Sequence, residues 1–220
     1  MIIAIDGPAA SGKSTTAVGV AKRLGITYLD TGAMYRAVTF GLVDNNIRFN
    51  DSSNVERFLE KIEIKFSEGS SGVLLTLNDR DITKEIRSVV VTDNVSEVSA
   101  LKIVRKSMVS IQRKMAEVDD CVLEGRDIGT VVFPNADYKF FLIADQKSRA
   151  ERRLQDLKSI GENSSIDKVM MDLMNRDHKD STRMHSPLKK SDDAIIIDTS
   201  NLGINKVIDK IVNIVKHKGH

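Results

Sequence analysis

Several residue types are scarce in this chain, and each scarcity argues against a structural feature or a class of protein. Among its 220 residues there is no tryptophan and one cysteine, Cys121, and aromatic residues make up only 5%. A single cysteine excludes a disulfide within the chain, and the apolar run 121–123 predicts that this side chain is buried. So few aromatic residues argue against a protein that binds RNA by stacking bases on aromatic platforms.

An excess of charge of one sign is also lacking. The chain has 33 Lys and Arg residues against 31 Asp and Glu, a net charge of +2, so it lacks the polybasic field that nucleic-acid and membrane partners usually need. It contains no run of about 18 apolar residues and no charged-then-apolar signal segment. We therefore expect a cytoplasmic protein without a nucleic-acid or membrane partner, and a monomer.

A complete phosphate-binding loop stands near the N-terminus. Residues Gly7-Pro8-Ala9-Ala10-Ser11-Gly12-Lys13-Ser14 match the pattern G-x-x-x-x-G-K-[ST], between the apolar run 1–5 and a helical pattern over 16–24. In such loops backbone amides and a helix N-terminus surround phosphates, and the lysine reaches the β- and γ-phosphates. The loop predicts nucleoside triphosphate binding, with Ser14 or Thr15 offering a hydroxyl to magnesium.

Short apolar segments alternate with helical patterns along most of the chain. This alternation is typical of a parallel sheet covered by helices on both faces. We expect an α/β fold with a three-layer P-loop core, and residues 1–220 in a single domain. The predicted strands are 2–5, 27–29, 121–123, 138–143 and 194–197, and the predicted last helix is 205–216.

One region interrupts the alternation. Segments 62–66 and 73–77 flank the glycine- and serine-rich stretch 67–72, which predicts an antiparallel β-hairpin. The hairpin stands between a helix that starts near Ala33 and a long helix predicted over 97–116. It is either a small mobile subdomain over the site or an edge hairpin of the main sheet.

Two polar clusters follow predicted strands, at the edge where open α/β sheets bind ligands. The first cluster, 30–36, ends in Arg36, whose guanidinium could bind a second phosphate. Taken alone, this position is better explained as a solvent-exposed residue of a helix. The second, 124–133, has three charged residues around a glycine, which core packing does not explain. In it Arg126 can grip a phosphate bidentately, and Glu124 can orient magnesium-bound water.

A third cluster, 175–183, is predicted to be helical. Positions i, i+4 and i+7 of this helix would place Arg176, Asp180 and Arg183 on one face. This pattern fits a binding site and an exposed ion pair on the surface equally well. Upstream, Arg149, Arg152 and Arg153 form another basic stripe. Two arginine-bearing helices suit a lid that closes on a triphosphate.

Taken in order, segments 7–14, 30–36, 81–88, 124–134 and 175–183 resemble the cytidylate kinase family of nucleoside monophosphate kinases over nearly the whole chain. The resemblance implies an enzyme that phosphorylates CMP and dCMP with ATP and Mg²⁺. It also implies a nucleoside monophosphate-binding insertion, near 62–96, and a helical lid, near 149–183. Two departures are a serine directly after the lysine, where some relatives have glycine, and Glu124, where aspartate is common.

The resemblance assigns roles to matching positions. Catalysis falls to Lys13, Arg126, Arg176 and Arg183. Contacts with ATP fall to Gly7, Pro8, Ala9, Ala10, Ser11, Gly12, Lys13, Ser14, Thr15, Arg149 and Arg153, and contacts with magnesium to Ser14 and Glu124. Contacts with the acceptor nucleotide fall to Thr31, Arg36, Ser96, Arg105, Arg126, Asp127, Arg176, Asp180 and Arg183.

The implied readers of the cytosine edge are Ser96, Arg105 and Asp127. A carboxylate can accept from the N4 amino group of cytosine but repels the O4 oxygen of uracil, so we expect CMP and dCMP to be preferred over UMP. A UMP or AMP kinase is the nearest alternative. A nucleotide-dependent switch is less favoured, because the chain has no guanine-reading Asn-Lys-x-Asp sequence and its arginine clusters would lack an acceptor phosphate.

Overall fold

The computed structural model describes residues 1–69, 72–159 and 161–218. The chain divides into two compact units. The core unit consists of Met1–Asp30 and Met115–His220, and the inserted unit consists of Thr31–Lys114.

The core unit contains a five-stranded parallel sheet in the order β2-β6-β1-β7-β8. Its strands are β1 (Ile2–Asp6), β2 (Thr27–Asp30), β6 (Cys121–Gly125), β7 (Tyr138–Ile143) and β8 (Ile195–Asp198). The central strand, β1, is a continuous apolar run because it is buried on both faces, as parallel strands are. All five predicted strands are confirmed, each within two residues of its predicted ends.

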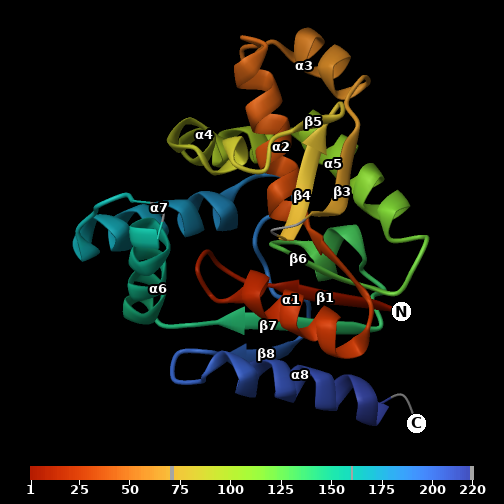
Figure 1. Ribbon diagram of the computed structural model, residues 1–220, viewed down its shortest axis with the longest axis vertical. Helices are drawn as coiled ribbons and strands as arrows, with labels where there is room; N and C mark the ends of the chain where they lie inside the picture. Colours follow the sequence, from red (N-terminus) through yellow and green to blue (C-terminus); the bar gives the residue numbers. More distant parts are fainter. Residues whose placement is uncertain (70–71, 160, 219–220) are drawn as a thin grey trace. The chain divides into compact units, whose positions relative to one another are not determined.

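Two helices, α1 (Lys13–Leu24) and α8 (Ile204–Lys218), lie side by side along the sheet (Figure 1). The main core forms where they meet it, and Ile3, Ile5, Val20, Phe140 and Ile211 are among its most completely buried side chains. This packing holds α1 against α8 and the sheet, so the loop before it starts from a rigid base. The prediction of a C-terminal helix is confirmed, with one more residue at its start and two more at its end.

The helices α6 (Gln146–Ser159) and α7 (Ile166–Thr182) pack against each other and contain most of the predicted lid residues. Ala150, Val169 and Leu173 form a small buried cluster between them, which includes Ala9 of the phosphate-binding loop. The helix pair is therefore packed directly on that loop.

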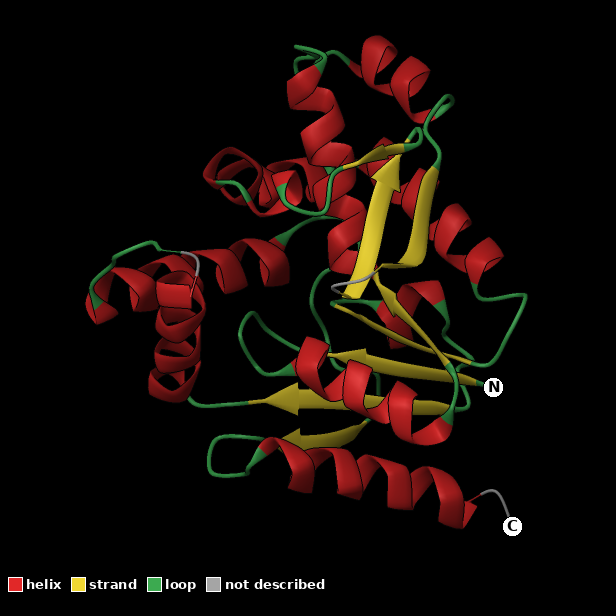
Figure 2. Ribbon diagram, viewed as in Figure 1, coloured by secondary structure: helices red, strands yellow, loops and turns green. Residues whose placement is uncertain are grey.

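The inserted unit combines helices with a separate three-stranded antiparallel sheet (Figure 2). Its elements are α2 (Thr31–Asp44), α3 (Ser52–Leu59), β3 (Ile64–Gly69), β4 (Gly72–Leu77), β5 (Arg80–Asp81), a 3-10 turn (Glu85–Arg87), α4 (Val89–Ala100) and α5 (Lys102–Met115). The predicted hairpin is confirmed, with Phe66 opposite Leu75, and it forms a sheet of its own instead of joining the parallel one. Residues 70 and 71 of the predicted turn lie outside the described residues.

The prediction of one long helix over 97–116 is wrong. The helical region starts earlier, at Val89, where the Ser88 side chain caps α4, and it is interrupted at Leu101, whose ψ of 123° is extended. Arg105 stabilises the break, because its Nη1 donates to the carbonyl of Ser99, 3.1 Å away, near the end of α4. A side chain from the following helix thus ends α4, which a local pattern cannot indicate.

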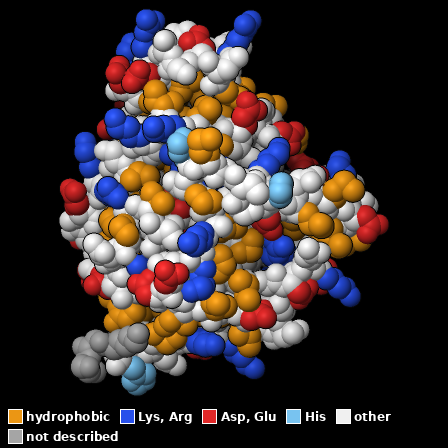
Figure 3. All heavy atoms as spheres, turned by 180° about the vertical axis from the view of Figure 1, so that it is seen from behind, with side chains coloured by type: hydrophobic (Ala, Val, Ile, Leu, Met, Phe, Trp, Pro, Cys, Tyr) orange, Lys and Arg blue, Asp and Glu red, His pale blue; other side chains and the backbone are white. Residues whose placement is uncertain are grey.

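Basic and acidic side chains are interspersed over the face displayed in Figure 3, in keeping with the near-balanced composition. Across the part of the chain that is described, no helix has the length and the apolar composition needed to span a membrane.

Close packing in the inserted unit depends on Gly41 of α2. A Cβ at Gly41 would lie 2.2 Å from Cζ of Phe58 and 2.9 Å from Cδ2 of Leu77. We expect Gly41→Ala to lower the free energy of unfolding by about 1–2 kcal/mol, because overpacking outweighs the roughly 1 kcal/mol that alanine gains in a helix. Urea denaturation measures the change. Gly203→Ala is the control, since a Cβ there has nothing within 4 Å; equal stability of the two variants would contradict the prediction.

Candidate active site

The phosphate-binding loop joins β1 to α1 and depends on two glycines. Gly7 has φ 152° and Gly12 has φ 88°, in the region that glycine tolerates best. A Cβ on Gly7 would lie 2.2 Å from the backbone oxygen of Leu142 in β7, so the loop is held tightly against the sheet. Gly12 is the N-cap of α1, and with no side chain there the first amides of the helix stay open to a bound phosphate.

Lys13 is buried and lies over its own loop. Its Nζ donates to the carbonyl of Pro8, 2.6 Å away. Burial, followed by the nearby charge of Arg126, lowers the pKa of Lys13 to about 7, while Glu124 opposes the shift. A bound triphosphate would bring the negative charge that favours the protonated form, so the lysine is suited to a polyanionic ligand.

Tyr28 of β2 connects the two residues that were expected to contact magnesium. Its hydroxyl donates to Oε1 of Glu124, 2.6 Å away, and is hydrogen-bonded to Ser14. Burial and the charge of Glu124 both raise the pKa of Tyr28, which keeps the hydroxyl protonated as a donor. Ser14 therefore lies near Glu124 through Tyr28, whereas Thr15 lines the pocket beside Arg152. Sequence reasoning missed Tyr28.

These residues fit a magnesium ion. Hydroxyl and carboxylate oxygens are the hard ligands that Mg²⁺ prefers, and Mg²⁺ usually combines one or two protein ligands with phosphate oxygens and water. Within the described ranges, no three His, Cys, Asp or Glu side chains are grouped to hold a metal ion by themselves. Glu124 and Ser14 can therefore contribute to a site that a nucleotide completes.

A buried network of arginines and aspartates forms where β6 and α7 end. Nε of Arg126 donates to Oδ2 of Asp180 at 2.8 Å, and Arg183 lies 4.0 Å from Asp180 and 3.7 Å from Asp127. Burial alone would raise the pKa of Asp180, but Arg126 and Arg176 outweigh it and lower that pKa. Paired charges of this kind can exchange partners when an anionic ligand enters.

Arg183 departs from the expected geometry. The helix α7 ends at Thr182, and Arg183 is its C-cap, with an extended ψ of 142°, so it does not share a helical face with Arg176 and Asp180. The chain turns there, and Nε of Arg183 donates to the carbonyl of Ser186 at 2.7 Å. This turn, rather than helical spacing, brings Arg183 to Asp127 and Asp180.

Asp6, the last residue of β1, is a buried carboxylate that sequence reasoning missed. It accepts hydrogen bonds from the amides of Ile128 at 2.9 Å and Gly129 at 2.7 Å. Burial raises the pKa of Asp6 to about 6, although both amides oppose the shift. The available signal was an aspartate at the end of an apolar strand, directly before the phosphate-binding loop.

Arg149 of α6, which was expected to contact ATP, binds the backbone of the phosphate-binding loop. Its Nη1 donates to the carbonyl of Ala9 at 3.2 Å and forms an ion pair with Asp177 of α7. Asp177 also accepts from the amide of Ala9, at 3.1 Å. Arg149 and Asp177 thus fix both polar groups of one loop residue.

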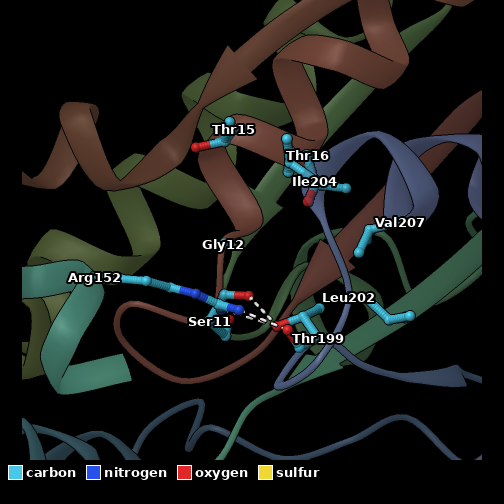
Figure 4. A pocket seen from close by; sticks show the side chains of 9 residues that line it. All are labelled: Ser11, Gly12, Thr15, Thr16, Arg152, Thr199, Leu202, Ile204 and Val207. Atoms are coloured by element: carbon cyan, nitrogen blue, oxygen red, sulfur yellow. Dashed lines mark hydrogen bonds between the residues drawn. The ribbon is translucent and has the colours of Figure 1, made fainter. Parts of the chain in front are cut away.

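Arg152, one turn further along α6, reaches a pocket of about 210 Å³ behind the loop (Figure 4). Its guanidinium donates to the carbonyl and the hydroxyl of Thr199, at 2.6 and 3.0 Å. The lining residues are Ser11, Gly12, Thr15, Thr16, Arg152, Thr199, Leu202, Ile204 and Val207. Arg153, which was expected to contact ATP, is partly buried on α6 and is not among them.

The inserted unit carries the remaining expected site residues on α2, α4 and α5. Nη1 of Arg36 donates to the carbonyl of Ile86 and the hydroxyl of Thr92, both at 3.0 Å. Arg105 is buried over the ring of Tyr35, 5.2 Å from its centroid. The other two, Thr31 and Ser96, lie at the first position of α2 and on α4.

Comparison with known proteins identifies the family. The sequence profile described as "Cytidylate kinase" matches residues 3–217. The chain belongs to the cytidylate kinase family. It is therefore a phosphotransferase of the nucleotide-binding kinase class, and its expected fold class is confirmed.

Relatives in the cytidylate kinase family match the chain from end to end. A cytidylate kinase of Acholeplasma laidlawii is 46% identical over 214 residues, covering 97% of this chain and 94% of that protein. A cytidylate kinase of Carboxydothermus hydrogenoformans is 47% identical over 218 residues, covering 99% and 98%. Among solved structures, an uncharacterized protein from Eubacterium ventriosum shares the fold, with a TM-score of 0.55 at 14% identity over 99% and 98% of the two chains.

The loop geometry of this cytidylate kinase family member makes Gly7 indispensable. We expect Gly7→Ala to weaken ATP binding by at least about tenfold, because its Cβ meets a backbone oxygen that cannot move aside. Isothermal titration calorimetry measures the affinity. The control is Gly25→Ala, which also has a positive φ but open space around the added Cβ. Wild-type affinity in Gly7→Ala would show that the loop can rearrange freely.

Proposed function

We propose that this chain transfers the γ-phosphoryl group of ATP to CMP and dCMP, with Mg²⁺, to give CDP and dCDP. One observation carries the proposal. β1 and β6 are neighbouring parallel strands with Asp6 beside Gly125, so the phosphate-binding loop and Arg126 leave the sheet at the same edge. A phosphate cradle and a cluster of buried arginines at one edge suit a donor and an acceptor phosphate.

The chemistry asks little of the protein beyond alignment and charge. An acceptor phosphate oxygen is already anionic, so no strong base is required. Lys13 and the loop amides bind the β- and γ-phosphates, while Arg126, Arg176 and Arg183 stabilise the charge that spreads over the transferring group. Asp180 pairs with Arg126, and an entering acceptor phosphate would take over part of that pairing.

Magnesium is assigned to Ser14 and Glu124. The ion neutralises phosphate charge when it is bound with the nucleotide. The hydrogen bond from Tyr28 orients the Glu124 carboxylate, and this matters because glutamate has one more rotatable bond than aspartate.

The donor base is assigned to the pocket beside Arg152. The planar guanidinium of Arg152 points toward Ser11 and Thr199, in a pocket that apolar side chains such as Leu202 and Val207 also line. A flat base attached to the bound triphosphate suits such a slot, because guanidinium groups stack well on aromatic rings. Arg149 supports the loop backbone and so contributes to ATP binding indirectly.

The acceptor contacts follow the residue roles that the family resemblance implies. The phosphate is assigned to Arg36, Arg126, Arg183 and Arg176, the ribose to Asp180 and Arg183, and the cytosine edge to Ser96, Arg105 and Asp127, with Thr31 as a further contact. The fixed guanidinium groups of Arg36 and Arg105 support these roles, since positioned donors lose less entropy on binding. The Asp127 carboxylate favours cytosine through its N4 amino group.

A coupled ADP-release assay with ATP and Mg²⁺ tests the proposal, with CMP, dCMP, UMP, AMP and GMP offered separately. We expect fast turnover with CMP and dCMP and much slower turnover with the others. Preference for UMP or AMP would keep the phosphotransfer and overturn the base contacts. ADP release with none of the five acceptors, despite ATP binding, would overturn the proposed function.

Arg126 is the most direct single test of the acceptor side. We expect Arg126→Ala to lower kcat by at least about 100-fold, because it removes a cation from the transferring phosphoryl group. The fold should persist, since Arg183 still lies near Asp180. Steady-state kinetics and a urea midpoint measure the two effects. Arg23→Ala, which breaks an exposed ion pair with Asp209, is the control; near-normal turnover in Arg126→Ala would exclude Arg126 from the site.

A further inference from the structure

Asp6 caps a helix to which it does not belong in sequence. The amides that it binds, those of Ile128 and Gly129, open a short π-helical segment, Ile128–Val132. The first amides of a helix have no acceptor within the helix itself and need an outside partner. The carboxylate of Asp6 provides that partner from the neighbouring strand, in a site where it is only 5% exposed.

The residue that would ordinarily provide this cap is Asp127. It is the N-cap of the same segment, and aspartate at an N-cap usually accepts from the amide two or three residues ahead, here that of Gly129 or Thr130. Here Asp127 has φ −147° and ψ 23° and makes no such hydrogen bond. Its Oδ1 lies instead 3.7 Å from Nη2 of Arg183, among the arginines of the site.

Local packing holds the two amides against Asp6. A Cβ at Gly129 would lie 3.2 Å from Cδ of Lys139 and 3.4 Å from Oδ2 of Asp6, so glycine permits the short contact. Lys139, on β7, is itself fixed by Asp193 at 2.8 Å. The turn after β6 is thus braced from both β1 and β7.

We infer that Asp6 is a positioning residue for recognition of the acceptor base. By accepting from the amides of Ile128 and Gly129, it keeps the carboxylate of Asp127 from capping this helix and directs that carboxylate to the nucleotide. The inference rests on the proposed function, in which Asp127 accepts from the N4 amino group of cytosine. Without Asp6, Asp127 is the carboxylate closest in sequence to the freed amides, and capping the amide of Gly129 would remove it from the base.

Asp6→Asn tests this with little change in shape, since it replaces one acceptor oxygen by an amino group that faces an amide donor. We expect the KM for CMP to rise, and the ratio of kcat/KM for CMP to that for UMP to fall, each by about tenfold, with the KM for ATP within about twofold of wild type. A residue that only supports the fold would lower both kcat/KM values equally. An unchanged CMP-to-UMP ratio, or a change confined to ATP, would overturn the inference.

A double variant tests whether Asp6 acts through Asp127. If it does, adding Asp6→Asn to Asp127→Asn should lower the CMP-to-UMP ratio no further than Asp127→Asn alone. A further multiplicative loss would contradict the inference. Asp193→Asn is the matched control, because it disturbs the packing of Lys139 without touching the two amides; its ratio should stay at the wild-type value.

Thermal unfolding of each variant confirms that the compared proteins are folded. If Asp6→Asn does not fold, Gly129→Ala serves instead: it leaves Asp6 in place but moves the amide away, and it should lower the same ratio. Kinetics of the wild-type enzyme distinguish a failure of the proposed function from a failure of the role assigned to Asp6. No preference for CMP in the wild type would overturn the proposed function, whereas a wild-type preference that Asp6→Asn retains would overturn only the role of Asp6.

Discussion

The parallel pairing of β1 with β6 is the constraint on which the active site depends. It places the phosphate-binding loop and the turn after Gly125 at one edge of the sheet, although more than a hundred residues separate them. The hydrogen bonds that Asp6 accepts from the amides of that turn make the connection rigid. Because β1 is buried between β6 and β7, a shift in its register would displace both the loop and the turn.

Burial of charge is the second feature that shapes the site. Charged groups that leave water need partners, and three arginines of the site are paired with carboxylates: Arg126 with Asp180, Arg149 with Asp177, and Arg183 with Asp127. Such pairs add little net stability, but they hold side chains in fixed places. The Arg149 pair fixes the loop that binds ATP, whereas the other two involve residues assigned to the acceptor. Buried ion pairs therefore support both the proposed ATP site and the proposed acceptor site.

Local sequence patterns predict those features of the structure that depend only on residues close together in the chain. The loop motif, five strands and the hairpin are read from spacing and glycine content. The break at Leu101, the cap by Asp6 and the bridge by Tyr28 depend on hydrogen bonds between residues 6, 123 and 96 positions apart, so no local pattern reports them. Arg183 illustrates this limit of local patterns. Helical spacing grouped it with Arg176 and Asp180, but the helix ends at Thr182, and a turn brings Arg183 to Asp180. The monomeric state and cytoplasmic location stay predictions.

Glu124 illustrates how a change at one position depends on its surroundings. A glutamate at the end of β6 has one more rotatable bond than an aspartate would have there, and that bond adds freedom that an oriented ligand should not have. The Tyr28 hydroxyl removes that freedom, because it binds Oε1 at 2.6 Å and also contacts Ser14. β2 and β6 pair with Asp30 opposite Glu124, so Tyr28, two residues earlier, approaches from the adjacent strand. Glu124 and Tyr28 therefore act as a pair: the tyrosine fixes the orientation of the carboxylate, and the sequence around either residue alone does not indicate this.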